Sequence, residues 1–366
     1  MSSGILNESS LASSFHTTRD WVVEAISLIR SDTYRSADTH LHKLDLNSFN
    51  DVDIYLKDES THATGSLKHR LARSLFLYGI CNGDIKEDTI IVEASSGSTA
   101  ISEAYFAKML GLRFISVVPE KTSSKKLQTI RHYGGEIAYA EPSNIYGEAQ
   151  RIANENGGYY MDQFTFAERV TDWRGNNNIA ESIFEQISLE RHPVPEWIVV
   201  GAGTGGTSAT VGRYIRYQAP RFQRTKLCVA DPEGSVFFDT FSGPNEEAAN
   251  LTRGSIIEGV GRPRHEPSFV PSVVDTMMKV KDEASIATSL WLSDLLDRPF
   301  GGSTGLNVYA SLRLACQMRN NNVKGSIVTL ICDDGHRYMD TVHCEKWRKQ
   351  HGLDVAPMLQ ELEQLV

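Results

Sequence analysis

Short apolar runs alternate with segments of helical spacing through the first half of the chain. In a helical segment the apolar residues recur three and four positions apart, whereas a run of four or five largely apolar residues is typical of a buried strand. The alternation comprises the segments 89–93, 99–110, 114–118, 124–132, 137–140 and 146–154. Three successive strand and helix pairs predict a parallel sheet that is covered by helices on both faces.

The same alternation returns after a polar and aromatic stretch at 162–178. Strands are predicted at 197–200, 226–230 and 327–331, with helices at 179–189, 208–218, 284–296 and 306–318. The predicted fold class is therefore α/β, with two doubly wound and mostly parallel sheets.

Two domains are expected from this division. The first comprises 49–175, and the second combines 16–48 with 176–345. We expect residues 1–15 to be flexible and residues 346–366 to form a C-terminal tail or helix. The Gly- and Pro-rich stretch 242–271 is predicted to be a long functional loop or lid.

Charge and composition narrow the kinds of partner. The 366 residues carry a formal net charge of −9, and the basic residues form no long run. This argues against nucleic acid or an anionic membrane surface and favours a small molecule. The Ser-rich first fifteen residues lack the basic and apolar segments of a signal peptide, so a cytoplasmic protein is expected.

The five cysteines are scattered, with no Cys-x-x-Cys pair and no histidine at ligand spacing. An odd, scattered set is typical of reduced thiols, so no metal site is predicted. Cys228 and Cys332 lie inside apolar runs and are expected to be buried packing residues.

Lys68 lies where a predicted strand, 53–57, gives way to a predicted helix with Leu71 and Leu75 on one face. The backbone N–H groups and the positive end of the helix dipole disfavour a charged amine there and favour a nucleophilic one. Most lysines in a sequence are solvated surface charges, so Lys68 alone does not establish a site.

A glycine-rich loop, 201–207, directly follows a buried strand and opens a helix. Consecutive backbone N–H groups at a helix N-terminus suit a phosphate. The loop also matches G-x-G-x-x-G, and Asp231 closes the next strand, as in dinucleotide-binding folds. Dinucleotide binding, binding of another phosphate, and a purely structural turn remain open at this point.

Two loops rich in hydroxyl groups occupy similar positions. Residues 95–99 lie between a strand and a helix, and residues 301–305 precede another helix. Hydroxyl and N–H groups at a helix N-terminus suit a carboxylate, but Ser or Thr there is also a good N-cap.

We expect all of these loops to lie at strand-to-helix junctions, and the carboxyl ends of strands in an open α/β sheet face a common crevice. The amine of Lys68, a carboxylate site and a phosphate cradle are therefore expected to converge. Together they suggest pyridoxal phosphate as the cofactor.

The segments 66–70, 95–99, 203–207 and 302–305, in that order, resemble the fold-type II pyridoxal-phosphate enzymes of the cysteine synthase and cystathionine β-synthase family. The resemblance covers about residues 35–335 and implies a tryptophan synthase β-like fold with the cofactor between the two domains.

Two longer runs are more specific. Within the family, residues 171–178 (TDWRGNNN) and 257–263 (IEGVGRP) most resemble the bacterial L-cysteine desulfhydrases.

The resemblance implies a role for each loop. Lys68 is implied to hold the cofactor covalently and, once released, to act as the general base. Ser303 is implied to hydrogen-bond the pyridine nitrogen. The implied phosphate ligands are Gly203, Thr204, Gly205, Gly206 and Thr207, and the implied substrate-carboxylate ligands are Ser95, Ser96, Ser98 and Thr99, with Gln163 nearby.

Ser98 departs from the family pattern, because cysteine synthases have an asparagine there that contacts the ring oxygen of the cofactor. Asn177 and Asn178 stand where the synthases tend to carry a Thr-Thr-Gly run. Both changes argue against the synthase reaction, although the shorter Ser98 is retained as a candidate cofactor ligand.

The implied activity is β-elimination of L-cysteine to sulfide, pyruvate and ammonia by a protein that is expected to be a homodimer, as is common in the family. Two alternatives use the same residues: β-replacement by a cysteine synthase or cystathionine β-synthase-like enzyme, and dehydration of serine. A dinucleotide-binding protein or a non-catalytic scaffold is the alternative from another class.

Overall fold

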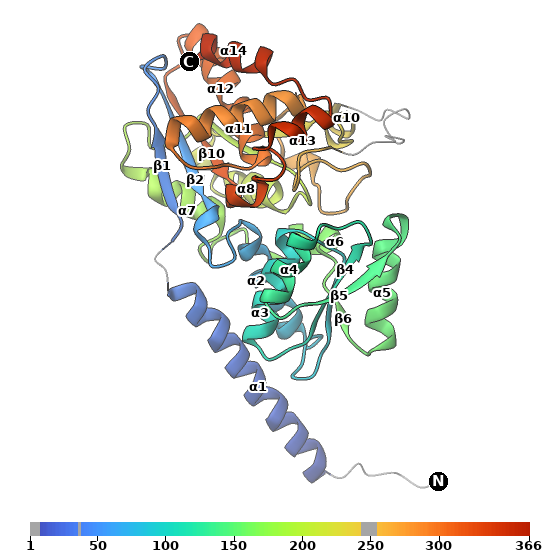
Figure 1. Cartoon of the computed structure of the whole chain (residues 1–366). Coiled ribbons are helices and arrows are strands. Elements are labelled where there is room, and N and C mark those ends of the chain that lie inside the picture. The colour runs from blue at the N-terminus through green and yellow to red at the C-terminus, as the bar shows by residue number, and fades with distance from the viewer. Residues whose placement is uncertain (1–7, 36–37, 243–254) are drawn as a thin grey trace. The chain divides into compact units, whose positions relative to one another are not determined.

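The computed structural model describes residues 8–35, 38–242 and 255–366 (Figure 1). Contacts within the chain define two compact units. Unit 1 comprises the described part of 1–37 together with 68–163, and unit 2 comprises 38–67 with the described part of 164–366. These boundaries differ from those expected from sequence.

Unit 1 contains a four-stranded parallel sheet in the order β5-β4-β3-β6. Its strands are β3 (Ile91–Glu93), β4 (Phe114–Pro119), β5 (Glu136–Ala140) and β6 (Tyr159–Tyr160). The chain passes outward from β3 to β5 and then returns to place β6 on the other side of β3. The loops after β3 and β6 therefore lie side by side, at the position where open α/β sheets bind ligands.

The described part of unit 1 also contains the helices α1 (Glu8–Tyr34), α2 (Lys68–Asn82), α3 (Ser98–Met109), α4 (Ser124–His132) and α5 (Ile145–Glu155), of which α1 packs against α2. We expected the segment of α1 from residue 16 onward to belong to the second domain. It belongs to unit 1 because Asp32 of α1 accepts hydrogen bonds from Tyr105 of α3 (2.5 Å) and from His69 of α2 (3.2 Å). Residues 8–15, expected to be flexible, are helical, and residues 1–7 lie outside the described residues.

Unit 2 contains a six-stranded sheet in the order β1-β2-β10-β7-β8-β9. All of its strand pairs are parallel except β1 with β2. The strands are β1 (His40–Leu44), β2 (Val52–Asp58), β7 (Trp197–Gly201), β8 (Lys226–Pro232), β9 (Thr276–Val280) and β10 (Gly325–Ile331). As in unit 1, the chain returns to the far side of an earlier strand, which makes β7 and β10 neighbours.

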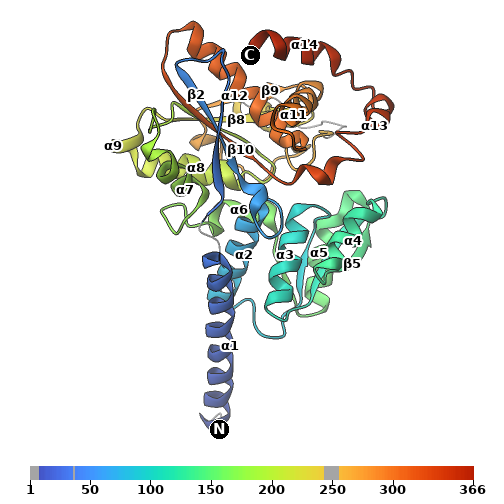
Figure 2. The ribbon, with the colours of Figure 1, turned by 60° about the vertical axis from the view of Figure 1, so that its left-hand side comes forward.

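Helices cover both faces of this second sheet (Figure 2). Apolar residues of α11 (Asp282–Leu296), α12 (Gly302–Asn320) and α14 (Ala356–Leu365) pack on one face, with Ile54 and Ile327 of the sheet. Those of α7 (Ile179–Gln186), α8 (Gly206–Tyr217) and α10 (Phe237–Ser242) pack on the other, with Val328. The remaining helices are α6 (Gln163–Val170), α9 (Ala219–Phe222) and α13 (Glu345–Gln350). No helix in the described ranges has the length and apolar character that crossing a membrane requires.

The predicted fold class is confirmed, as are the longer strands and helices. The short elements that were not predicted include β1, β6, α6, α9 and α10. β6 has only two residues, and β1 reads His-Leu-His-Lys-Leu with mostly exposed side chains, so neither carries the apolar run that indicates a strand. Part of the predicted loop 242–271, residues 243–254, lies outside the described residues.

Cys228 and Cys332 are buried, as expected. Burial raises the pKa of the Cys228 thiol to about 12, so this cysteine is an unreactive packing residue.

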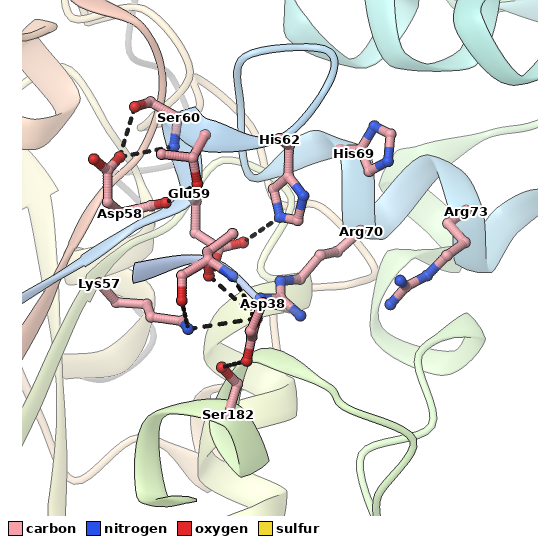
Figure 3. A network of polar contacts seen from close by, with 12 residues as sticks. Asp38, Lys57, Asp58, Glu59, Ser60, His62, His69, Arg70, Arg73 and Ser182 are labelled. Atoms are coloured by element: carbon pink, nitrogen blue, oxygen red, sulfur yellow. Dashed lines mark hydrogen bonds and ion pairs between the residues drawn. The ribbon is translucent and has the colours of Figure 1, made fainter. Parts of the chain in front are cut away.

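Unit 2 contains a buried lysine, Lys57 of β2, in a network of polar side chains (Figure 3). The Lys57 ammonium donates to the Thr39 carbonyl oxygen (2.9 Å) and to Gln186 Oε1 (2.7 Å), and lies 3.6 Å from Asp38. Asp38 also accepts a hydrogen bond from Ser182 of α7. The network joins the loop before β1 to α7, and it satisfies a charge that would be costly to bury alone.

We predict that Lys57→Met lowers the free energy of unfolding by about 2–4 kcal/mol, because Asp38, the Thr39 carbonyl and Gln186 lose their buried donor. Lys279→Met is the matched control, since Lys279 pairs with Asp239 at a partly exposed position, and its cost is expected to stay within about 0.5 kcal/mol. Urea unfolding measures both. Equal losses in the two variants would show that the buried network contributes nothing.

Candidate active site

Lys68 is the first residue of α2, as the sequence predicted. The helix packs against α3, and its inner face is buried through residues such as Leu71 and Leu75. Glu103 of α3 is close enough for the charge on Lys68 to act on its carboxyl group. The amine is therefore at a helix N-terminus, with a buried acid in its neighbourhood.

The serine loop, residues 95–99, follows β3 and leads into α3. The N-cap of α3 is Gly97, which has no side chain, so the capping role that Ser and Thr often have is not used at that position. The Ser116 hydroxyl donates to the carbonyl oxygen of Ser95 (2.5 Å), which ties the loop to β4. Residues 95–98 are partly exposed, whereas Thr99 is buried.

Gln163 follows β6 and begins α6. The Thr99 hydroxyl donates to Gln163 Oε1 at 2.7 Å, and both side chains are buried. Two of the predicted substrate residues, 64 positions apart, are thus in direct contact. Their contact follows from the pairing of β3 with β6.

The glycine loop of unit 2 follows β7 and opens α8. Gly205 has φ +92°, a backbone conformation that favours glycine. A Cβ on Gly203 would lie 2.3 Å from the carbonyl oxygen of Gly259, and one on Gly206 would lie 2.9 Å from the Cβ of Ala167. Close backbone packing therefore requires glycine at several positions, and it leaves a compact turn of N–H groups at the start of α8.

Asp231 does not have the setting that the dinucleotide hypothesis requires. It is fully buried, and its Oδ2 accepts a hydrogen bond from the N–H of Phe238 (2.8 Å) in α10. Burial raises its pKa to about 6. A carboxylate that binds a ribose must reach the ligand, whereas Asp231 is used inside the fold.

Ser303 is the second residue of α12 and is buried. The expectation that its loop follows a strand is wrong, because α12 comes directly after α11 in the chain. Beside it, Thr304 Oγ1 accepts a hydrogen bond from the N–H of Cys332 (3.1 Å), at the end of β10. Asn307, one turn further along α12, donates to Cys332 Sγ (3.2 Å). Since β7 and β10 are neighbours, the start of α12 and the glycine loop lie at the same edge of the sheet.

Sequence reasoning missed several polar residues at these edges. Asp333 follows β10 and accepts a hydrogen bond from the Tyr338 hydroxyl (2.6 Å), and burial raises its pKa to about 6. Glu93 ends β3, and Glu103 lies inside α3. Glu93 could have been identified from the sequence, because a charged residue at the end of an apolar strand is unusual. Glu103 could not, because its position in the sequence is that of an ordinary polar residue in a helix.

Residues 33–333 match the pyridoxal-phosphate dependent enzyme family, and the chain belongs to that family. It is 56% identical to L-cysteine desulfhydrase Cds1 of Mycobacterium tuberculosis over 93% of this chain and 92% of that protein. It is 29% identical to N-(2-amino-2-carboxyethyl)-L-glutamate synthase of Ralstonia nicotianae, over 81% and 84% of the two chains. It is 27% identical to a cysteine synthase of Dictyostelium discoideum, over 84% and 82%.

The crystal structure of O-ureido-L-serine synthase superimposes with a TM-score of 0.71 at 24% identity, covering 83% of this chain and 91% of that one. This likeness shows the fold. The resemblance to the cysteine synthase and cystathionine β-synthase family is therefore confirmed.

The residues present fit the cofactor that the family uses. Lys68 offers an amine at a helix N-terminus, and the glycine loop offers N–H groups where the Cβ of any other residue would collide with backbone.

We predict that Gly203→Ala lowers the free energy of unfolding by about 1–3 kcal/mol, because the new Cβ forces the glycine loop away from Gly259. Gly175→Ala is the control, since its Cβ would come no closer than 3.4 Å to a neighbouring atom, the Glu181 Oε1. Denaturant titration of the two variants compares them. Wild-type stability in Gly203→Ala would contradict the close packing of this loop.

Proposed function

We propose that this protein is a pyridoxal-phosphate-dependent carbon–sulfur lyase that converts L-cysteine to sulfide, pyruvate and ammonia. The observation that carries the proposal is 56% identity to an L-cysteine desulfhydrase over nearly the full length of both chains. The position of Lys68 at the start of α2 supports it, because the reaction needs an amine that can bind the cofactor and then move a proton.

In this proposal each loop has a separate task. Lys68 would hold the cofactor covalently, and its amine would serve as the general base for the proton on Cα of the substrate. The glycine loop, 203–207, holds the phosphate at the N-terminus of α8, and Ser303 hydrogen-bonds the ring nitrogen. Ser98 is a further cofactor ligand. The bound cofactor supplies a sink for the electrons left at Cα.

The serine loop binds the substrate carboxylate through Ser95, Ser96, Ser98 and Thr99. The N-terminus of α3 lies at this loop, so the helix dipole favours the negative charge there. The hydrogen bond from Thr99 to Gln163 fixes the direction of both side chains. An amino acid held by its carboxylate presents Cα to the general base in one orientation, which is how positioning lowers the barrier.

β-Replacement remains the second candidate, because several relatives are synthases and the same residues serve both outcomes. We favour elimination because the desulfhydrase is 56% identical, whereas these synthases are 27% and 29% identical.

We also propose that the protein is cytoplasmic and a homodimer. The odd, scattered set of five cysteines, which is typical of reduced thiols, supports the first point, and homodimers are common in the family. Light scattering of the purified protein measures the mass in solution, and a monomer would contradict the dimer.

We predict that Lys68→Ala abolishes the visible absorbance of the bound cofactor and the release of sulfide, because no other amine replaces the covalent link. Lys86→Ala, at an exposed position, is the control and is expected to keep both. An unchanged spectrum in Lys68→Ala would reject Lys68 as the attachment site.

We predict that the purified protein, given L-cysteine alone, produces sulfide and pyruvate in equal amounts. Elimination releases one of each per turnover, whereas a replacement enzyme forms little pyruvate and consumes a second nucleophile. Assaying both products in one tube, with and without added O-acetylserine and sulfide, separates the two. Pyruvate formation that stays negligible would favour β-replacement.

A further inference from the structure

Glu93 joins the ends of two adjacent strands in unit 1. It is the last residue of β3 and is fully buried. Its Oε1 accepts a hydrogen bond from the N–H of Ala94 (2.7 Å), and its Oε2 accepts one from the N–H of Gln163 (3.1 Å). One carboxylate therefore holds both the start of the serine loop and the start of α6.

The hydrogen bonds continue from Gln163 back to the serine loop. The Gln163 side chain accepts from the Thr99 hydroxyl, and Thr99 is at the beginning of α3. Glu93 is thus bonded to both ends of the connection: directly to the start of the serine loop, and through Gln163 to Thr99 at its end. A change at Glu93 is transmitted to the hydroxyl groups that the proposed function assigns to the substrate carboxylate.

Glu103 lies one helical turn after Thr99 on α3, at the spacing that puts two residues on the same face. It is fully buried, and no described residue donates a hydrogen bond to either of its oxygens. Its hydrogen-bonding neighbour is the carboxyl group of Glu93. Two ionised carboxylates cannot hydrogen-bond to each other, so this contact requires a proton.

The distribution of donors decides which residue carries the proton. Glu93 accepts two backbone N–H groups, which favours its ionised form relative to that of its neighbour. Glu103 accepts none within the described residues. The neutral acid is therefore Glu103, and it donates to Glu93.

Other titratable groups face the pair from α2 and β6. Lys68 of α2 acts on Glu103, while Asp162 and Tyr160, whose hydroxyl oxygen is buried, act on Glu93. Burial raises the pKa of both carboxyl groups, and the charge on Glu93 raises that of Glu103 further despite Lys68. The pair consequently keeps a proton at neutral pH.

We propose that Glu103 is a positioning residue for the substrate carboxylate: as a neutral acid it donates a hydrogen bond to Glu93, which holds the serine loop against Gln163. That the serine loop binds a substrate carboxylate rests on the proposed function, whereas the shared proton of Glu93 and Glu103 does not. A neutral Glu103 also adds no second negative charge beside Lys68, so it does not favour the ammonium form over the amine that chemistry needs.

Infrared spectroscopy of the full-length protein in D2O tests the proton directly. At pH 7.5 we expect the carbonyl band of a protonated carboxylic acid in the wild type, and its loss in both Glu103→Leu and Glu103→Gln. Asp231→Asn is the control, because the pKa of Asp231 is about 6 and this group is mostly ionised at that pH. No such band in the wild type, or a band that survives both substitutions, would overturn the proposal.

The pH dependence of stability gives a second readout. Because burial raises the pKa of the pair above the ordinary value of 4.5 for a glutamate, the folded state binds more protons than the unfolded state above about pH 4.5. The stability that the pair contributes is therefore full below about pH 4.5 and is lost as the pH rises through the raised pKa of the pair. Glu103→Gln should make this decline shallower, since the amide donates to Glu93 without titrating; a decline as steep as in the wild type contradicts a shared proton.

Kinetics separate positioning from a merely structural role. Glu103→Gln keeps a donor to Glu93 and should leave KM for L-cysteine within about threefold, whereas Glu103→Leu has no donor and should raise KM about tenfold with a smaller effect on kcat. Equal KM values in the two variants would refute the positioning role. If the wild type releases no sulfide from L-cysteine, the proposed function fails, and the infrared band still decides whether the pair is protonated.

Discussion

In both units the chain adds strands on one side of an early strand and then returns to add a later strand on its other side. The arrangement of each unit depends on this return. It makes β6 the neighbour of β3 in unit 1 and β10 the neighbour of β7 in unit 2. Parallel strands end at the same edge, so each return places two loops side by side. In unit 1 these are the serine loop and the start of α6; in unit 2 they are the glycine loop and the segment after β10, to which α12 is bonded.

Buried carboxyl groups hold these edges together. Glu93 at the end of β3 accepts two backbone N–H groups, Asp231 near the end of β8 accepts one from α10, and Asp333 after β10 accepts the hydroxyl of Tyr338. Burial raises the pKa of all three. The segments that follow these strands are thus held in place by buried carboxyl groups, which leaves the other polar groups of the loops available to a ligand.

The glycine loop shows why a short pattern has limited value. Gly203, Gly205 and Gly206 are each required by a close approach to neighbouring backbone or side chains, whatever the loop binds. The G-x-G-x-x-G spacing therefore agrees equally with a structural turn, a phosphate site and a dinucleotide site. The buried setting of Asp231 argues against the dinucleotide, and the family match over residues 33–333 indicates pyridoxal phosphate as the cofactor, for whose phosphate we propose this loop.

The sequence by itself determined the features that depend on near neighbours in the chain. Apolar spacing identified α4 with its observed bounds, the position of Lys68 at a helix start, and the loops that follow β3 and β7. It did not determine the partnership of Glu93 with Gln163 and Glu103, or the placement of α1 in unit 1. Helical and extended periodicity arise from local hydrogen bonding and burial, whereas these contacts depend on which strands become neighbours, and only the tertiary structure decided that.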